Sequence, residues 1–168
     1  SVWLEKEKHQ RRSDIIPPQI KIAGNYTSSM MAKWQARKNG YDEIILTDEN
    51  GFITEAPTSN VFLVNQDDVL LTAPKKEVLY GITRKSILDI ADNEGIKTIV
   101  ERIPLLELEN AKEVFITSSS HLVCPVIKID NNPVGSGGIG VLTDKLKQRF
   151  LKISQGQDSF FSDWLDSI

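Results

Sequence analysis

The sequence predicts a mixed α+β fold in which strands predominate in the core and helices flank it. Several short runs rich in Ile, Val, Leu and Phe are bounded by Asn, Asp and Gly, which is typical of strands and turns. Three longer segments space their apolar residues at helical intervals. With 168 residues, 40% of them hydrophobic, the chain can form one globular domain with a sizeable core.

The first expected helix runs from Tyr26 to Lys38, and Asn39-Gly40 is a natural C-terminal stop. Its apolar residues at roughly helical spacing are Met30, Met31, Trp34 and Ala36. Two hairpins are expected next. Their arms are 43–47 and 52–55, around the turn 48–51, and then 60–64 and 69–72.

A second helix is expected from Ile82 to Asn93, with Gly95 as its stop. A short helical turn is expected from Leu105 to Asn110, and a last helix from Thr143 to Ile153 after the Gly-rich loop 135–140. The remaining expected strands are Lys97–Ile103, Glu113–Thr117 and Val123–Asp130.

Charge and composition exclude several classes of protein. The formal net charge is −3, and Lys and Arg are scattered, so nucleic-acid binding is not expected. The one basic run, Lys6 to Arg12, is diluted by polar and acidic residues and is expected to be a solvated segment. No apolar run approaches the roughly 20 residues that span a membrane. The start at Ser1 has no signal-peptide pattern and suggests part of a longer chain.

Cysteine and histidine are scarce. The single cysteine, Cys124, excludes an internal disulfide, which fits a reducing cytoplasm. His9 and His121 have no partner that the sequence can identify. Two isolated histidines and one cysteine do not predict a metal site.

Three motifs carry chemistry: Lys21 to Tyr26 (KIAGNY), Thr54 to Asn60 (TEAPTSN) and Gly81 to Arg84 (GITR). A lysine amine forms a Schiff base with an aldehyde, and the start of a helix suits a phosphate. These motifs, with the Glu55 carboxylate in the second of them, resemble those of the fold-type IV pyridoxal-phosphate enzymes. That family includes branched-chain and D-amino-acid aminotransferases and aminodeoxychorismate lyase. The match runs from about Lys21 to Phe150.

The resemblance implies the C-terminal domain of the D-amino-acid aminotransferase-like fold, with a barrel-like β-rich core flanked by helices. Residues 1–20 would form a leading strand and the interdomain connection, 21–153 the cofactor-binding domain, and 154–168 a C-terminal tail. The small N-terminal domain of the family, which supplies an arginine to the phosphate and much of the substrate pocket, is absent from this sequence.

The resemblance also assigns roles to residues. Lys21 would form the Schiff base and move the proton between the substrate Cα and C4′ of the cofactor. Glu55 would pair with the pyridine nitrogen, which keeps the ring protonated as an electron sink. The N–H groups of Ile82 and Thr83, with the Thr83 hydroxyl, would bind the phosphate. Leu79 would pack on the ring.

Other expected contacts are less general in the family. Tyr26 would donate to the phenolic oxygen of the cofactor, as in branched-chain aminotransferases. After the expected strand come Ser118 and Ser119, which would bind the cofactor, and Ser120, which would contact the substrate. Branched-chain enzymes usually have Glu-Asn where this chain has Ser59-Asn60, which is closer to the D-amino-acid and lyase branches.

The function expected is therefore a class IV aminotransferase that moves an amino group from an amino acid to a 2-oxo acid in a ping-pong reaction, in a parent protein that is a homodimer. Two alternatives stay open. One is a lyase of the aminodeoxychorismate type, and the other is a catalytically silent folding or assembly unit.

Overall fold

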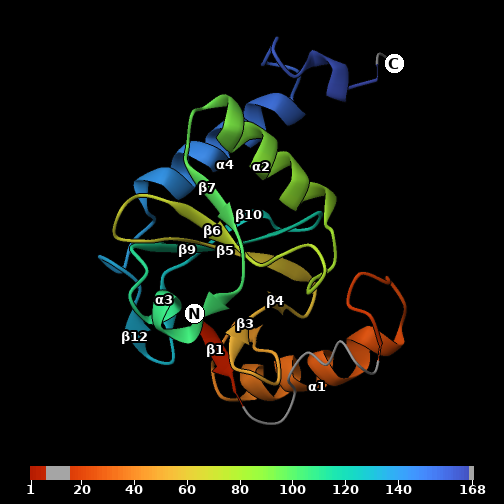
Figure 1. The fold of residues 1–168 in the computed structure, drawn as a ribbon, viewed down its shortest axis with the longest axis vertical. Helices are drawn as coiled ribbons and strands as arrows, with labels where there is room; N and C mark the ends of the chain where they lie inside the picture. Colours follow the sequence, from red (N-terminus) through yellow and green to blue (C-terminus); the bar gives the residue numbers. More distant parts are fainter. Residues whose placement is uncertain (7–15, 167–168) are drawn as a thin grey trace.

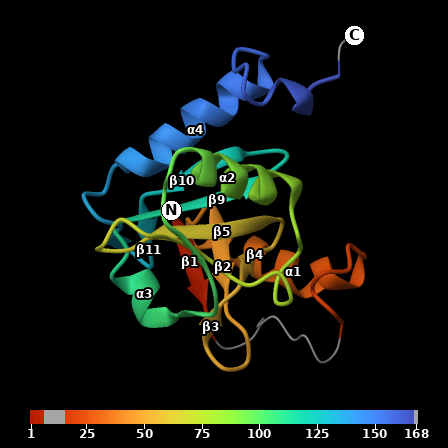
Figure 2. The same cartoon turned by 45° about the horizontal axis from the view of Figure 1, so that its top comes forward.

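The structure, a computed structural model, describes residues 1–6 and 16–166. Its elements form four layers (Figures 1 and 2): helix α1, a small sheet, a large sheet, and helices α2 and α4 on the far face of the large sheet. The mixed α+β fold with a β-rich core flanked by helices is confirmed. Most of the basic run expected at the start, including His9, lies outside the described residues.

The large sheet is organised around the strand β5. Its path runs β10-β9-β5-β6-β7, and β4 also pairs with β5. All pairings are antiparallel except that of β6 with β7. The bounds are β4 Glu55–Ala56, β5 Ser59–Val64, β6 Leu70–Thr72, β7 Thr98–Val100, β9 Glu113–Ser118 and β10 Leu122–Val126.

The small sheet has the order β12-β11-β1-β2, and β1 runs parallel to β2 with Val2 opposite Glu43. A further pair, β3 and β8, joins the first expected hairpin to a later segment. The bounds are β1 Val2–Glu5, β2 Glu43–Leu46, β3 Phe52–Ile53, β8 Ile103–Pro104, β11 Lys128–Ile129 and β12 Asn132–Pro133.

The expected helices are confirmed, with small shifts at their ends. Their bounds are α1 Gly24–Lys38, α2 Ile82–Asn93, α3 Leu105–Glu109 and α4 Val141–Ser154, followed by the 3₁₀ turn η1 Ser162–Trp164. The buried face of α1 carries Ala32 and Ala36, whereas Met31 and Trp34 are more than half exposed. Apolar spacing therefore predicted this helix but not the face that packs.

Side chains alternate strictly between two hydrophobic clusters along β5. Val61 and Leu63 face the cluster between the two sheets, and Phe62 and Val64 face the cluster under α2 and α4. Successive residues of a strand point to opposite faces, and here both faces are covered. Phe62 also stacks on Phe115 of β9, with ring centroids 5.0 Å apart. The central strand is thus buried on both sides.

Two expected strands prove to be two strands each. The segment expected at 123–130 leaves the large sheet after β10, and β11 then joins the small sheet. The segment expected at 97–103 contributes β7 to the large sheet and Ile103 to β8. A period-2 pattern shows which residues are extended, but it carries no information on the partner strand, so it cannot mark a change of sheet.

Both hairpins are confirmed, the first with a correction. Thr47 bridges Ile53, and the Asp48 N–H donates to the Phe52 carbonyl at 2.9 Å. The expected strand 52–55 breaks at Thr54, whose N–H and hydroxyl both donate to the Leu46 carbonyl. After this break the chain enters β4 and joins the large sheet. The second hairpin, β5 with β6, forms as expected.

The division of the chain at residues 20 and 153 stays a prediction. Within the expected tail, Phe161 is buried and packs in the cluster under α2 and α4. No helix within the described residues has both the length and the apolar character needed to cross a membrane.

A buried ion pair joins α1 to the small sheet. Lys33 Nζ donates to Glu43 Oε2, and the side chains are only 8% and 7% exposed. The second oxygen, Glu43 Oε1, accepts from the Ile44 N–H at 3.1 Å. Since Lys33 lies two turns after Tyr26 on the same helix, this pair also fixes the orientation of the start of α1.

Removing one partner of this pair should be more harmful than removing both. We expect Lys33→Met to lower the free energy of unfolding by about 3–5 kcal/mol, because an unpaired carboxylate stays buried. The double variant Lys33→Met, Glu43→Leu should recover most of that loss. Urea unfolding measures both. The control is Lys85→Met, which breaks the exposed pair of Lys85 with Asp89 and should change stability little. A Lys33→Met loss no larger than that of the control would contradict the role given to the pair.

Candidate functional site

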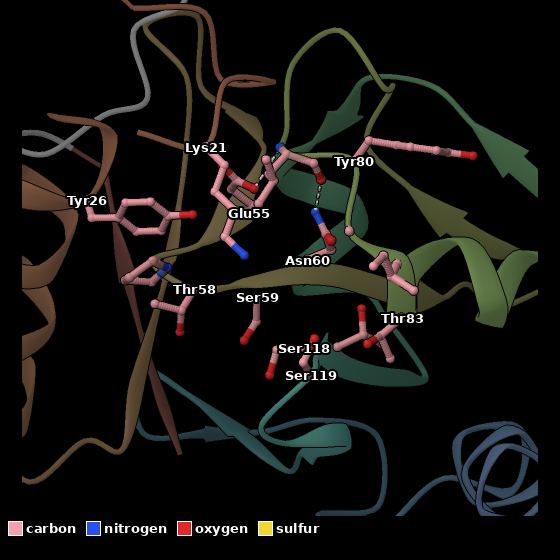
Figure 3. A pocket seen from close by; sticks show the side chains of 15 residues that line it. Lys21, Tyr26, Glu55, Thr58, Ser59, Asn60, Tyr80, Thr83, Ser118 and Ser119 are labelled. Carbon is pink, nitrogen blue, oxygen red and sulfur yellow. Dashed lines mark hydrogen bonds between the residues drawn. The ribbon is translucent and has the colours of Figure 1, made fainter. Parts of the chain in front are cut away.

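A cavity of about 280 Å³ opens where the start of β5, the end of β9 and the start of α2 meet (Figure 3). The structure brings eight of the nine predicted site residues to its lining: Lys21, Tyr26, Glu55, Leu79, Ile82, Thr83, Ser118 and Ser119. These residues come from four separate segments of the chain. The roles assigned to them individually stay predictions.

Lys21 lies in the non-helical segment just before α1 and is exposed. Figure 3 shows its amine and the Tyr26 hydroxyl pointing into the same space. The buried Asn25 side chain donates to the Ile20 carbonyl at 2.8 Å and to the Pro17 carbonyl at 3.1 Å. These two hydrogen bonds hold the segment that precedes Lys21 against the first turn of α1, so they fix the position of the Lys21 backbone.

Glu55 and Asn60 are paired across β4 and β5, and both of their side chains hydrogen-bond to the backbone of Leu79. Glu55 Oε2 accepts from the Leu79 N–H at 3.0 Å, and Asn60 Nδ2 donates to the Leu79 carbonyl at 2.8 Å. Glu55 is only 3% exposed and Asn60 only 5%. Both polar backbone groups of Leu79, which lies three residues before the first residue of α2, are therefore hydrogen-bonded to buried side chains.

The start of α2 is available to an anion. Gly81 precedes the helix with φ −67° and ψ 141°, and no side chain caps the first turn. The first N–H groups of a helix have no intrahelical partner, and the dipole places partial positive charge there. The Ile82 side chain is 82% exposed, so that residue can serve the cavity only through its backbone. Thr83 is buried and lines the cavity.

Gly81 allows the chain to pass close to β5. A Cβ at this position would lie 2.4 Å from Asn60 Oδ1. The side chain that would be displaced is the one that holds the Leu79 carbonyl. Glycine is therefore required here by close approach rather than by backbone conformation.

Two buried hydroxyls in the cavity lining have no partner among the described residues. They are Ser59 Oγ and Thr117 Oγ1, on residues that are 5% and 1% exposed. A buried hydroxyl without a hydrogen bond costs free energy, and such groups in proteins are almost always satisfied. A polar ligand in the cavity would satisfy both.

Ser120 lies outside the cavity lining and is exposed. Its hydroxyl is 3.2 Å from Ser118 Oγ and 3.2 Å from His121 Nδ1, and Ser118 Oγ is also 3.2 Å from that nitrogen. His121, for which the sequence identifies no partner, thus contacts two hydroxyls at the edge of the cavity. The contact of Ser120 with the substrate stays a prediction.

Asn60, Ser59 and Thr117 also line the cavity, although no sequence motif predicts that they face a ligand. A signal existed for each of them. All three are polar residues at the ends of strands with apolar centres, where a polar side chain that becomes buried needs a partner. Tyr80 also lines the cavity, but Figure 3 shows its ring pointing away. In the described ranges, no group of three His, Cys, Asp or Glu side chains could hold a metal ion.

The cavity is polarised. A buried carboxylate, Glu55, lies on one side, and the uncapped start of α2 with the hydroxyls of Ser118 and Ser119 lies on the other. The Lys21 amine points in between them. This arrangement suits an elongated ligand with a proton-bearing or cationic group at one end and an anion at the other.

Comparison with known proteins agrees with this geometry. The model of the amino-transferase class IV family matches residues 4–129, and the chain belongs to that family. A probable branched-chain-amino-acid aminotransferase of Aquifex aeolicus is 34% identical over 94% of this chain. The branched-chain-amino-acid aminotransferase of Escherichia coli K12 is 36% identical over 91%. The alignments cover 52% and 50% of those two proteins, so the chain spans about half the length of the curated relatives that it matches.

The fold agrees as well. A crystal structure of the Escherichia coli branched-chain amino acid aminotransferase matches with a TM-score of 0.91 and 32% identity. The match covers 98% of this chain and 54% of the solved one. The expected C-terminal part of a fold-type IV enzyme is therefore confirmed.

We expect Gly81→Ala to weaken the binding of inorganic phosphate by about tenfold or more, because the added Cβ displaces the Asn60 amide and with it the start of α2. The backbone conformation at Gly81 is accessible to alanine, so the unliganded protein should stay folded. Calorimetric titration with phosphate checks affinity, and circular dichroism checks the fold. The control is Gly138→Ala, whose Cβ would meet only Ser136 Oγ at 3.7 Å. Equal affinities for the two variants would show that close approach at Gly81 is not needed.

Proposed function

We propose that this chain is the cofactor-binding part of a pyridoxal-phosphate-dependent aminotransferase, which transfers an amino group from an amino acid to a 2-oxo acid. One observation carries the proposal. In a member of the class IV family, an amine, a buried carboxylate and an uncapped helix start surround one cavity.

The residues of the cavity fit pyridoxal phosphate. The unpartnered hydroxyls of Ser59 and Thr117 indicate a polar ligand in the cavity. Two solved structures of a similar branched-chain amino acid aminotransferase contain pyridoxamine 5′-phosphate and N-(5′-phosphopyridoxyl)-L-glutamate. In this chain the phosphate would be held by the N–H groups of Ile82 and Thr83 and by the Thr83, Ser118 and Ser119 hydroxyls.

At the other end of the cavity, Glu55 would hold a proton on the pyridine nitrogen. The Leu79 N–H donates to Glu55 Oε2, which keeps the carboxylate oriented. Leu79 lines the cavity and would pack on one face of the ring. Tyr26 would donate its hydroxyl to the phenolic oxygen. When bound, the cofactor supplies an aldehyde for the amino group and a ring that accepts electrons from the substrate Cα.

Lys21 is the residue that would carry the proton. Its amine would bind the aldehyde at rest and, once released, take the proton from the substrate Cα and deliver it to C4′. That task requires a mobile amine close to the ring, and Lys21 is exposed and directed into the cavity. Ser120, at the edge, would contact the substrate carboxylate.

The names of the relatives favour a branched-chain amino acid as donor. We further propose that the whole protein is a cytoplasmic homodimer. The family resemblance supports the dimer, and the single cysteine supports the reducing compartment.

A lyase of the aminodeoxychorismate type is the second candidate, because Ser59 stands where branched-chain enzymes usually have Glu. Two assays on the same sample separate the candidates. Amino transfer from an amino acid to 2-oxoglutarate supports the aminotransferase, and release of pyruvate from aminodeoxychorismate supports the lyase.

The first test is the visible absorbance of the purified chain mixed with pyridoxal phosphate. We expect a band that borohydride bleaches, and we expect it to vanish in Lys21→Ala. Lys128→Ala, which removes an exposed lysine on β11, is the control against reaction with surface amines and should keep the band. A band that survives in Lys21→Ala would remove Lys21 from the role given to it. No band in the wild-type chain would refute cofactor binding by this chain.

A further inference from the structure

Arg84, the third residue of α2, is buried beside the cavity rather than in it. Its side chain is 1% exposed and is the largest of the fully buried side chains among the described residues. One guanidinium nitrogen, Nη2, donates to the Ala73 carbonyl at 2.7 Å. The guanidinium carbon lies 5.7 Å from the centre of the Tyr80 ring.

This cation has no carboxylate partner within ion-pair distance in residues 1–6 and 16–166. Its Nε is buried and makes no hydrogen bond there. Burial of an ionised group is costly unless other charges compensate it. Burial lowers the pKa of Arg84, and the nearby Tyr80 and Glu55 oppose that shift. An anion close to Arg84 would therefore stabilise its buried positive charge.

Arg84 is also next to the groups that form the anion-binding end of the cavity. It follows Thr83 directly, and its Cβ lies 3.7 Å from the position that a Cβ on Gly81 would occupy. Its bond to Ala73 holds the first residue of the segment 73–81, which connects β6 to α2. Glu55 and Asn60 hold the same segment near its other end, at Leu79.

We propose that Arg84 is a positioning residue of the site: its buried positive charge and its bond to Ala73 raise the affinity of the amino end of α2 for a phosphate monoester. The inference rests on the proposed function and adds to it a residue that does not line the cavity. The charge acts through the low-dielectric interior, where it is screened less than a surface charge. The bond keeps the segment 73–81 in place before the ligand arrives.

The experiment separates charge from packing by comparing ligands with and without phosphate. Pyridoxal phosphate, pyridoxal and inorganic phosphate are titrated calorimetrically into the wild-type chain, Arg84→Met and Arg84→Lys. Lys85→Met is the control, because Lys85 is the next residue of α2 and its cation is exposed. Melting temperatures of the unliganded proteins are measured in parallel.

We expect Arg84→Met to weaken pyridoxal phosphate and inorganic phosphate roughly tenfold, as the loss of a nearby, poorly screened charge predicts. Pyridoxal should bind within about twofold of wild type, because it lacks the group that Arg84 serves. Arg84→Lys replaces the guanidinium with an amine whose pKa falls on burial, so its phosphate affinity should lie between those of Arg84→Met and wild type. Lys85→Met should bind like wild type.

An equal loss of affinity for pyridoxal and pyridoxal phosphate in Arg84→Met would overturn the proposal, since packing alone would then explain it. So would unchanged phosphate binding. If Arg84→Met fails to fold, the folded Arg84→Lys variant decides, and a loss of affinity that is equal for pyridoxal and pyridoxal phosphate refutes the role of the charge. A wild-type chain that binds neither pyridoxal compound refutes the proposed function instead, and the inorganic-phosphate titrations still test Arg84.

Discussion

Burial of β5 on both faces is the constraint on which the rest of the structure depends. Val61 and Leu63 close the core between the sheets, and Phe62 and Val64 close the core under α2 and α4. A strand with two packed faces cannot slip by one residue without moving every side chain into the wrong cluster. The register of its first residues, which include Asn60, is thereby set by hydrophobic packing. Packing of the core therefore sets the geometry of the site.

The segment 73–81, between β6 and α2, connects the core to the anion-binding end of the cavity. Arg84 fastens its beginning at Ala73, and Glu55 and Asn60 fasten Leu79 near its end. The carboxylate that would meet one end of the ligand therefore also orients the helix start that would meet the other. Changes at either end should affect both.

The sequence predicted the local elements well and their partners poorly. The helices at 24–38, 82–93 and 141–154 depend on spacing and stop signals that lie within each segment. The change of sheet between β10 and β11, and the exposure of Met31 and Trp34, depend on which surfaces meet. That is a property of chain segments far apart in sequence, so a local pattern does not contain it.

For the site, the sequence by itself determined the chemistry available: Lys21 before a helix, Glu55 at the end of an expected strand, and a glycine at the start of α2. Each of those signals is a short motif that can be recognised without knowing the rest of the fold. Only the tertiary structure decided that they share one cavity, that the Ser59 and Thr117 hydroxyls face it, and that Arg84 is buried behind it. Arg84 does lie three residues before the buried Ile87 on the same helix face, but its lack of a partner follows from the whole fold. Partnership and burial arise from long-range packing, and no window of the sequence specifies that packing.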